Sequence, residues 1–282
     1  MERKPGRVAT LWQGALMYAR RTRRGLSILQ QLGRTGLFRL EHRVSIAKLD
    51  YAAEDIYLYM DSKYAPMRIR SCAKEPWTIE WVEQWLVAGD VLYDVGANVG
   101  AYSLVAAKAP GRSVEVVAIE PAYATFASLC ENIVLNDVSD TVLPLNVTLG
   151  ASTGLGYFNY RDLEPGAGLH STGARPFLKG SFAPLYRQPV LTYTLDDLLA
   201  QFPLPKPTHL KIDVDGAELD VLQGAPFTLA SKDLRSLMIE VNEEEAEEMS
   251  GLIEGHGLSL RARFDPPGPH GHWYGIFARE RP

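Results

Sequence analysis

The chain has only two cysteines, Cys72 and Cys130, among its 282 residues. Two cysteines are too few for a disulfide-stabilised scaffold, and their spacing matches no metal-binding motif. No apolar run approaches the roughly 20 residues that a membrane-spanning helix needs. The N-terminus also lacks the uninterrupted apolar core of a secretory signal. We therefore expect two free thiols in a globular, cytoplasmic protein.

An overall excess of positive charge is missing as well. The formal net charge is −5, which disfavours a nucleic-acid-binding protein. Basic residues are nevertheless concentrated in residues 1–43, which hold ten Arg and Lys side chains and only Glu2 and Glu41 as acids. Hydrophobic residues between them indicate amphipathic helix, interrupted by glycines. We consider three interpretations of this basic arm. It packs on the main domain or on a second subunit of a homodimer, or it makes peripheral contact with a membrane surface. The third interpretation is that it binds an acidic partner or is disordered.

Two segments lead into the main domain. Residues 44–70 alternate loosely between apolar and polar, which predicts short antiparallel strands. A helix is predicted to begin at Pro76, and Trp77, Trp81 and Trp85 recur on one of its faces, a spacing typical of core packing. We therefore divide the chain into an N-terminal extension of helical arm and short strands, residues 1–73, and a main domain, residues 74–282.

From residue 91 onward, predicted strands and helices alternate. The strands are predicted over residues 91–94, 114–120, 141–149, 209–213, 237–241, 258–264 and 273–279. The helices are predicted over residues 101–109, 123–136, 195–202, 216–223 and 243–254, after the first helix at residues 76–86. Such alternation is typical of α/β proteins with a doubly wound, Rossmann-like sheet and helices on both faces. The last two strands are joined by too few residues for a crossover, so they pair antiparallel. The prediction is a seven-stranded, mostly parallel sheet with one antiparallel strand near the C-terminus.

Residues 150–189 interrupt this alternation with a stretch rich in Gly, Pro, Ser and Tyr. A long irregular insertion in a compact domain is commonly functional. It follows the carboxyl end of a strand, where open α/β sheets bind ligands. We interpret it as a substrate-facing insertion, with a neutral surface loop as the alternative.

The stretch at residues 94–100 carries the clearest chemical signal. It reads Asp-Val-Gly-Ala-Asn-Val-Gly and follows a short apolar strand, so a glycine turn leads into a helix N-terminus. A dinucleotide-binding turn has the spacing G-x-G-x-x-G, whereas this stretch has Asp-x-Gly-x-x-x-Gly. The Asp94 carboxylate would repel a pyrophosphate but attract a cationic ligand. The pattern therefore favours S-adenosylmethionine over a nicotinamide cofactor.

Further acids follow other predicted strands. Glu120 ends the second strand, where a carboxylate can accept hydrogen bonds from ribose hydroxyls. The fourth strand ends at Asp213, within the run Lys211-Ile-Asp-Val-Asp-Gly-Ala-Glu, and the fifth ends near Glu240. Crowded carboxylates need a compensating cation or proton. Lys211 is not the expected partner, because we expect its side chain to point the opposite way along the strand from the neighbours of Asp213.

Asp213 and Glu240 are the predicted general bases, on neighbouring strands beside a methyl-acceptor pocket. His170, in the insertion, and His272, at the start of the last strand, are further candidates. A divalent metal bridging Asp213 and Glu240 is a minority alternative, so no metal site is expected.

Several motifs in order resemble the FkbM-type family of class I S-adenosylmethionine-dependent methyltransferases. The resemblance runs roughly from Lys74 to Arg279. It is carried by Glu75-Pro76-Trp77-Thr78, residues 89–103, Ala118-Ile119-Glu120-Pro121, residues 131–136, Tyr193-Thr194-Leu195-Asp196, residues 210–222 and Ile239-Glu240. The chain differs from this pattern at Asp215, where many members have Glu.

The resemblance implies site residues and an activity. It implies that Asp94, Gly96, Asn98 and Gly100 hold the methionine part of S-adenosylmethionine, that Glu120 holds the ribose, and that Asn146 lies near the adenine. The implied activity is O-methylation of a hydroxyl on a sugar, glycan or natural product. A catalytically silent cofactor-binding or scaffold protein with the same fold is the alternative.

Overall fold

The computed structural model describes residues 45–172, 183–268 and 271–280. The basic arm, residues 1–43, lies outside the described residues, so the interpretations of that arm stay predictions. Part of the insertion, residues 173–182, lies outside them as well. In the part of the chain that the structure describes, no helix has the length and apolar character needed to cross a membrane.

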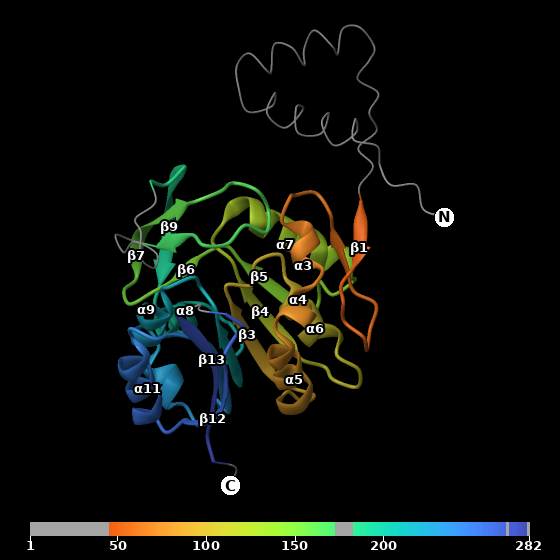
Figure 1. Cartoon of the computed structure of the whole chain (residues 1–282). Coiled ribbons are helices and arrows are strands. Elements are labelled where there is room, and N and C mark those ends of the chain that lie inside the picture. Colours follow the sequence, from red (N-terminus) through yellow and green to blue (C-terminus); the bar gives the residue numbers. More distant parts are fainter. Residues whose placement is uncertain (1–44, 173–182, 269–270, 281–282) are drawn as a thin grey trace, which may run out of the picture. The chain divides into compact units, whose positions relative to one another are not determined.

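A seven-stranded sheet forms the centre of the described chain (Figure 1). Its strands, in spatial order, are β12 (Ser259–Phe264), β13 (His272–Ala278), β11 (Ser236–Asn242), β10 (His209–Ile212), β3 (Val91–Val95), β4 (Glu115–Ile119) and β5 (Val142–Leu145). The neighbours from β11 to β5 pair in parallel, whereas β13 is antiparallel to both β11 and β12. The predicted fold class is confirmed.

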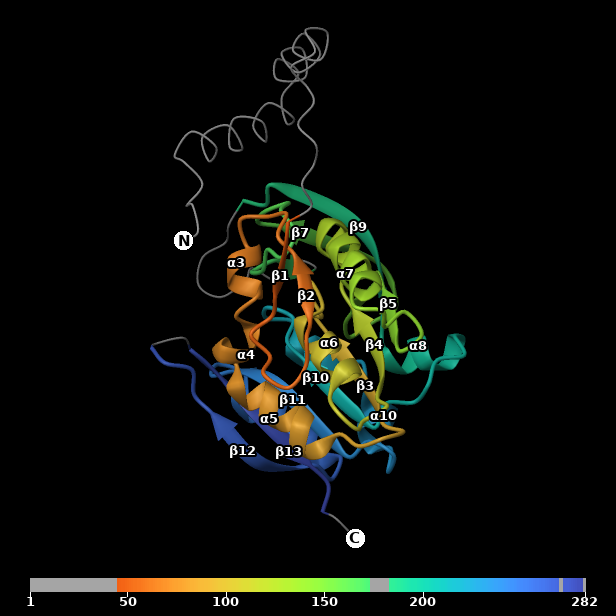
Figure 2. The ribbon, with the colours of Figure 1, turned by 90° about the vertical axis from the view of Figure 1, so that its right-hand side faces the viewer.

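Helices cover both faces of this sheet, as Figure 2 shows from the side. One face carries α5 (Pro76–Trp85), α6 (Ala101–Lys108) and α7 (Tyr123–Leu135), and the other carries α8 (Leu195–Gln201), α9 (Glu218–Gln223), α10 (Pro226–Ala230) and α11 (Ala246–Gly255). Alternation along β3 assigns Leu92 to the first core and Tyr93 to the second. Trp81 is fully buried in the first core, which confirms the predicted packing role for this residue. Trp77 and Trp85 are only partly buried against that core, and Trp77 also lines a cavity.

The described part of the N-terminal extension packs on the first face. Strands β1 (Ile46–Lys48) and β2 (Tyr57–Tyr59) pair antiparallel, as predicted. Asn132 of α7 accepts a hydrogen bond from the Tyr59 N–H at 3.0 Å, which attaches β2 to the main fold. The chain then forms two short helices, α3 (Ala65–Arg68) and α4 (Ser71–Lys74). The strand prediction for residues 44–70 is therefore wrong at α3, whereas α4 follows the segment for which strands are predicted.

The insertion is more regular than its composition indicates. Four strands, β6 (Thr148–Leu149), β7 (Gly154–Tyr160), β8 (Ser171–Thr172) and β9 (Tyr186–Tyr193), form a second sheet in the order β6-β9-β7-β8. The expectation of an irregular segment is therefore wrong for β7, β8 and the part of β9 within residues 150–189, and the strand predicted over residues 141–149 is divided between β5 and β6. Glycines in β7 and a proline in β9 weaken the strand pattern, while cross-strand pairing over residues 154–160 supplies the stability.

Candidate active site

A cavity of about 1010 Å³ opens at the carboxyl ends of β3, β4, β10 and β11. The glycine turn after β3 forms one part of its wall, and α3, α4 and the start of β13 form another. Its polar lining comprises Arg68, Lys74, Glu75, Asn98, Glu120, Arg161, His170, Lys211, Asp213, Asp215, Glu240, His272 and Tyr274. Segments far apart in the sequence therefore build one site, large enough for a nucleoside-sized ligand and a second molecule.

The glycine turn has a backbone that requires its glycines. Gly96 and Gly100 have φ angles of +86° and +91°, and Asn98 has +52°. A Cβ on Gly96 would lie 1.9 Å from the Asp213 carbonyl oxygen, and one on Gly100 would lie 2.6 Å from a methyl of Leu129. The contact at Gly96 is with backbone and cannot be relieved by a side-chain movement, so this position requires glycine to approach the end of β10. At Gly100 the Leu129 side chain could move, and the positive φ angle is what favours glycine.

Glu120 lies at the end of β4 and is almost fully buried. One oxygen accepts the Asn98 N–H at 3.0 Å, and the other accepts the Ala122 N–H at 2.8 Å. Burial raises its pKa to about 7, against the lowering effect of these two hydrogen bonds. The carboxyl therefore fixes the glycine turn while it lines the cavity.

Asp94, predicted to hold the cofactor, lies beneath the glycine turn and outside the cavity lining. Its Oδ2 accepts a hydrogen bond from the Ser103 hydroxyl at 2.6 Å. Its Oδ1 is buried without a hydrogen-bond partner among the described residues, 3.6 Å from the Lys211 ammonium. Asp94 therefore supports the glycine turn through its contacts with Ser103 of α6 and Lys211 of β10.

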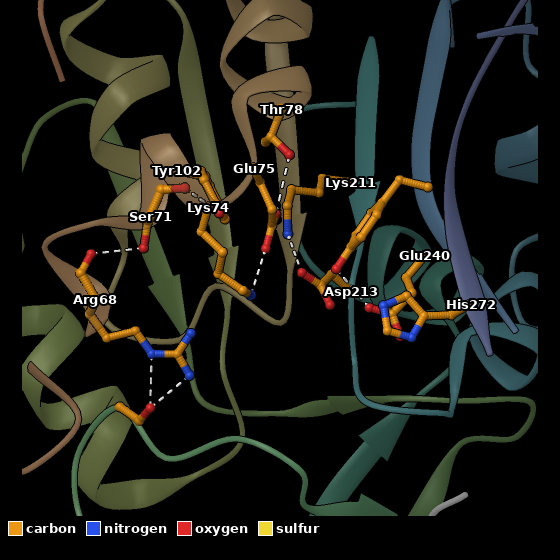
Figure 3. Close-up of polar contacts among 12 residues, drawn as sticks. Arg68, Ser71, Lys74, Glu75, Thr78, Tyr102, Lys211, Asp213, Glu240 and His272 are labelled. Atoms are coloured by element: carbon orange, nitrogen blue, oxygen red, sulfur yellow. Dashed lines mark hydrogen bonds and ion pairs between the residues drawn. The ribbon is translucent and has the colours of Figure 1, made fainter. Parts of the chain in front are cut away.

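Asn98 and Arg68 hold the segment of residues 164–170 across the cavity. The Asn98 amide donates to the Ala167 carbonyl at 3.0 Å. Arg68 donates from Nε and Nη2 to the Gly166 carbonyl, at 2.9 and 2.7 Å (Figure 3). We call residues 164–170 the strap. Part of the insertion thus lines the cavity, while its predicted role in facing a substrate stays a prediction.

Asn146 follows β5, as expected. Its amide donates to the carbonyls of Glu120 and Pro121, at 2.8 and 3.1 Å. The next residues, Val147 and Thr148, line the cavity instead. Asn146 therefore shapes the backbone around the predicted adenine position.

Our expectation for Lys211 is wrong. Residues i and i+2 of a strand point to the same face, so Lys211 and Asp213 share one side of β10. The Lys211 ammonium donates to Asp213 Oδ2 at 3.2 Å and lies 5.0 Å from the centre of the Tyr102 ring. Lys211 is 2 % exposed and supplies the compensating cation that the acids need.

Asp213 and Glu240 come together as predicted, since each directly follows the paired positions Ile212 and Ile239 of β10 and β11. Glu240 Oε2 accepts a hydrogen bond from the Tyr274 hydroxyl at 2.9 Å, and Oε1 lies 3.8 Å from His272 Nδ1. Figure 3 shows Lys211 on the Asp213 side of this pair and His272 on the Glu240 side. Both acids and His272 line the cavity.

The pair has opposite pKa shifts. Burial acts to raise the pKa of Asp213, but the positive charges of Lys211, Lys74 and Arg68 outweigh it and lower the pKa below the usual value. Burial, together with the negative charge of Asp213, raises the pKa of Glu240 to about 9. Carboxyl groups with diverging pKa values are typical of sites that move protons.

The turn after β10 holds two further acids. Asp215 has φ +58° and accepts the Leu169 N–H of the strap at 2.6 Å, and burial raises its pKa to about 6. Glu218 accepts the backbone N–H groups of Val214 and Gly216, at 2.9 and 3.2 Å. Asp215 therefore binds the strap, and Glu218 stabilises the turn.

His170, a candidate base, is packed among aromatic rings of the insertion. Its ring lies 5.2 Å from Phe158 and 5.3 Å from Tyr160, between centres. Nδ1 accepts the Arg161 N–H at 3.3 Å, so Nε2 carries the proton of the neutral ring and has no hydrogen-bond partner among the described residues. Burial lowers its pKa to about 4. This arrangement makes His170 a hydrogen-bond donor and disfavours it as a base.

Several residues that line the site were missed in the sequence. Arg68 and Lys74 come from segments with no chemical motif, Tyr102 lies within the motif of residues 89–103 but was given no role, and Tyr274 was assigned only to a closing strand. Glu75 was noted only within the family motif, yet it is buried and accepts a hydrogen bond from Lys74 at 2.8 Å. Within the described ranges, no group of three or more His, Cys, Asp or Glu side chains is arranged to hold a metal ion.

Comparison with known proteins gives relatives of one kind. The chain is 30% identical over 175 residues to hexuronic acid methyltransferase AglP of Haloferax volcanii, a match covering 62% of this chain and 65% of AglP. It is 30% identical over 201 residues to 31-O-demethyl-FK506 methyltransferase FkbM of Streptomyces tacrolimicus, covering 63% of this chain and 76% of that protein. The chain thus spans slightly less than two thirds of AglP.

Among solved structures, the chain is similar to precorrin-6y C5,15-methyltransferase from Geobacter metallireducens, with 14% identity and a TM-score of 0.42 over 73% of this chain and 86% of that one. It is also similar to TYW2 of M. jannaschii, with 14% identity and a TM-score of 0.43 over 85% of this chain and 89% of that one.

The family assignment rests on the sequence itself. The model of the FkbM methyltransferase domain matches residues 94–263, which is more than half of the chain. The match begins at the glycine turn and includes Glu120, Asp213 and Glu240, so the resemblance drawn from the motifs is confirmed. The chain belongs to the FkbM methyltransferase family.

Proposed function

We propose that this protein is an S-adenosylmethionine-dependent O-methyltransferase acting on a hydroxyl of a sugar, glycan or natural product. The observation that carries the proposal is the placement of Asp213 and Glu240 in the same cavity as the glycine turn. The names of two relatives, a hexuronic acid methyltransferase and a 31-O-demethyl-FK506 methyltransferase, support this class of acceptor.

The residues present fit the proposed cofactor. The glycine turn at residues 96–100 and Glu120 would hold it, and the acids Asp213 and Asp215 suit a cationic ligand rather than a pyrophosphate. When bound, S-adenosylmethionine supplies a methyl group on a positively charged sulfur. The Glu120 carboxyl accepts a hydrogen bond from the backbone of the glycine turn. In this proposal the same side chain also binds the ribose hydroxyls.

The acceptor side of the cavity combines carboxyl groups with an aromatic wall. Trp77 stacks on Phe264 with ring centres 5.8 Å apart and contacts Tyr274 at 5.3 Å. Trp77 and Tyr274 line the cavity together with Glu240. Carboxyl oxygens bind hydroxyl groups, and aromatic faces pack against the C–H faces of rings, so this wall supports a hydroxylated ring as acceptor.

Catalysis in this proposal is mainly positioning. The cavity walls orient the acceptor and exclude water, and a carboxylate at the end of β10 or β11 takes the proton of the acceptor hydroxyl. Such a base contributes roughly 10²- to 10⁴-fold to a rate.

The first test is calorimetry with S-adenosylmethionine, its demethylated product and NAD. Binding of the first two and not of NAD is the expected result, and the reverse pattern refutes the proposal. The second test is transfer of an isotope-labelled methyl group to hexuronic acids, neutral sugars and polyketide alcohols, with the modified atom located by mass spectrometry. Cofactor binding without transfer to any of these classes would favour a silent cofactor-binding protein.

We also propose a cytoplasmic location and a role for the basic arm, residues 1–43, in peripheral membrane contact. The support is its ten basic and two acidic side chains. Pelleting with anionic liposomes should fall when the arm is deleted. Equal pelleting with a loss of dimer in sedimentation would point to a second subunit instead.

A further inference from the structure

Lys211 occupies a position that strands seldom give to a lysine. It lies within β10, directly opposite Asp94 of β3, and is 2 % exposed. Fully buried lysines are rare, and a buried charge requires a partner. The ammonium has two carboxylates in reach, Asp213 at 3.2 Å and Asp94 at 3.6 Å. One cation thus serves the base of the glycine turn and one member of the acid pair.

The acid pair is surrounded unequally. Asp213 has the Lys211 ammonium at hydrogen-bonding distance (Figure 3). Glu240 receives a neutral hydroxyl from Tyr274, and the ring of His272 lies at 3.8 Å, beyond hydrogen-bonding distance. Glu75, Asp94, Asp213 and Tyr102 face Lys211, and Asp213, Asp215, Glu218, His272 and Tyr274 face Glu240. Besides Lys211, the positive charges of Lys74 and Arg68 also act on Asp213. The negative charges around Glu240 therefore exceed the positive ones.

Two carboxyl groups at the ends of adjacent strands rarely both ionise, because like charges in a partly buried site repel strongly. The group with the nearer cation remains a carboxylate, and its neighbour keeps a proton. We propose that Lys211 is a positioning residue that keeps Asp213 ionised and Glu240 protonated, so that Asp213 takes the acceptor's hydroxyl proton while Glu240 donates a hydrogen bond into the cavity. The first of these roles rests on the proposed function.

The titration behaviour agrees with this geometry. The pKa of Asp213 is lowered, whereas burial and the charge of Asp213 raise the pKa of Glu240 to about 9. Burial acts to lower the pKa of Lys211, but Asp213, Asp94 and Glu75 outweigh it and raise the pKa, so the ammonium keeps its charge at neutral pH. Lys211 is therefore no candidate for the base.

The assignment gives the two acids different chemistry. A protonated carboxyl has one O–H donor and one carbonyl acceptor, which is the pattern of a primary amide. Glu240→Gln therefore keeps a hydrogen-bond donor, and it keeps a carbonyl oxygen that can accept the hydrogen bond from the Tyr274 hydroxyl. Asp213→Asn, in contrast, removes the negative charge beside Lys211.

The proton positions can be read without an acceptor. The full chain, without cofactor, is labelled with ¹³C at the Asp and Glu side-chain carboxyl carbons, and their NMR shifts are followed with pH. Glu240→Gln and Asp213→Asn assign the two signals. We expect the Glu240 signal to be that of a neutral acid at neutral pH and the Asp213 signal to be that of a carboxylate.

Lys211→Met, which keeps the length and removes the charge, is the decisive variant. The Asp213 signal should then become that of a neutral acid at neutral pH, and this signal should be missing in the double variant Lys211→Met/Asp213→Asn. An ionised Glu240 in the wild type, or an Asp213 that stays ionised in Lys211→Met, overturns the inference. If the new neutral aspartate signal of Lys211→Met persists in the double variant, it does not come from Asp213, and that outcome overturns the inference as well.

A second measurement covers the case in which Lys211→Met does not fold. In Asp213→Asn, Glu240 loses its anionic neighbour, so its titration midpoint should fall by at least about one pH unit. An unchanged midpoint overturns the coupling. Failure of the proposed function is seen separately: a chain with this proton pattern that does not bind S-adenosylmethionine in calorimetry refutes the function and leaves the assignment of the proton intact.

Discussion

Replacement of Glu240 by glutamine should change how the stability of the protein depends on pH. The pKa of Glu240 is raised to about 9 in the folded state, whereas a glutamate in an unfolded chain titrates near its model value of 4.5. Between these two values the folded state binds the extra proton. The free energy of unfolding therefore falls as the pH rises from the unfolded to the folded pKa, and is highest below the lower one.

The size of the effect follows from the linkage. Each pH unit over which one state binds one more proton changes the free energy of unfolding by about 1.36 kcal/mol. From about pH 5 to about pH 8, this limit is about 4 kcal/mol. The Glu240 side chain is 15 % exposed and titrates together with Asp213, so we expect about 2–4 kcal/mol. At about pH 8, the Glu240→Gln variant should therefore be more stable than the wild-type protein.

The assay is urea denaturation at several pH values, followed by the fluorescence of the five tryptophans. Glu243→Gln, an exposed glutamate three residues away, is the matched control and should follow the wild-type curve. Parallel curves for wild type and Glu240→Gln would show that Glu240 is ionised in the folded protein, and the reasoning about the acid pair would then be wrong.

Three further predictions concern the supports of the site. Asp94→Asn weakens the ion pair with buried Lys211, which keeps its second partner, so the free energy of unfolding should fall by about 1–3 kcal/mol in denaturant titrations; a change below about 0.5 kcal/mol would contradict it. Gly96→Ala combines φ +86° with a Cβ 1.9 Å from a backbone oxygen, so cofactor binding in calorimetry should drop at least about tenfold and stability by more than about 2 kcal/mol. Arg68→Ala removes two hydrogen bonds to the strap, so hydrogen exchange at the Leu169 amide should become about 10- to 100-fold faster. Unchanged protection of this amide would show that the strap is held without Arg68.

The sheet and the glycine turn that lines the cavity were predictable because their signals are local. A strand of apolar residues followed by a glycine turn, as at residues 91–100, specifies both an element and a backbone approach. Neighbouring strand ends were also predictable, since parallel strands bring their carboxyl ends to one edge. This is why the meeting of Asp213 and Glu240 could be expected from the sequence.

The cavity wall formed by α3 and α4 was not predictable in the same way. Arg68 and Lys74 reach the cavity because hydrogen bonds to α7 fix the extension there, and no local pattern encodes that path. Lys211 was within reach of the sequence, since a two-residue spacing in a strand places two side chains on one face, and our prediction misapplied that rule. The second sheet was missed because its strands are stabilised by pairing with each other rather than by an alternating pattern.

The contact between Gly96 and the Asp213 carbonyl also bears on how acceptor preference can diverge within this family. The glycine turn and the end of β10, where Asp213 lies, are in close backbone contact. Neither segment can therefore shift without displacing the other. The insertion, by comparison, contacts the rest of the described chain through the strap and through side chains of neighbouring residues, such as Tyr160 and Asp162. Chimeras that exchange residues 150–189 between relatives should therefore redirect acceptor choice, whereas transplants limited to the turn should cost both cofactor binding and turnover at once.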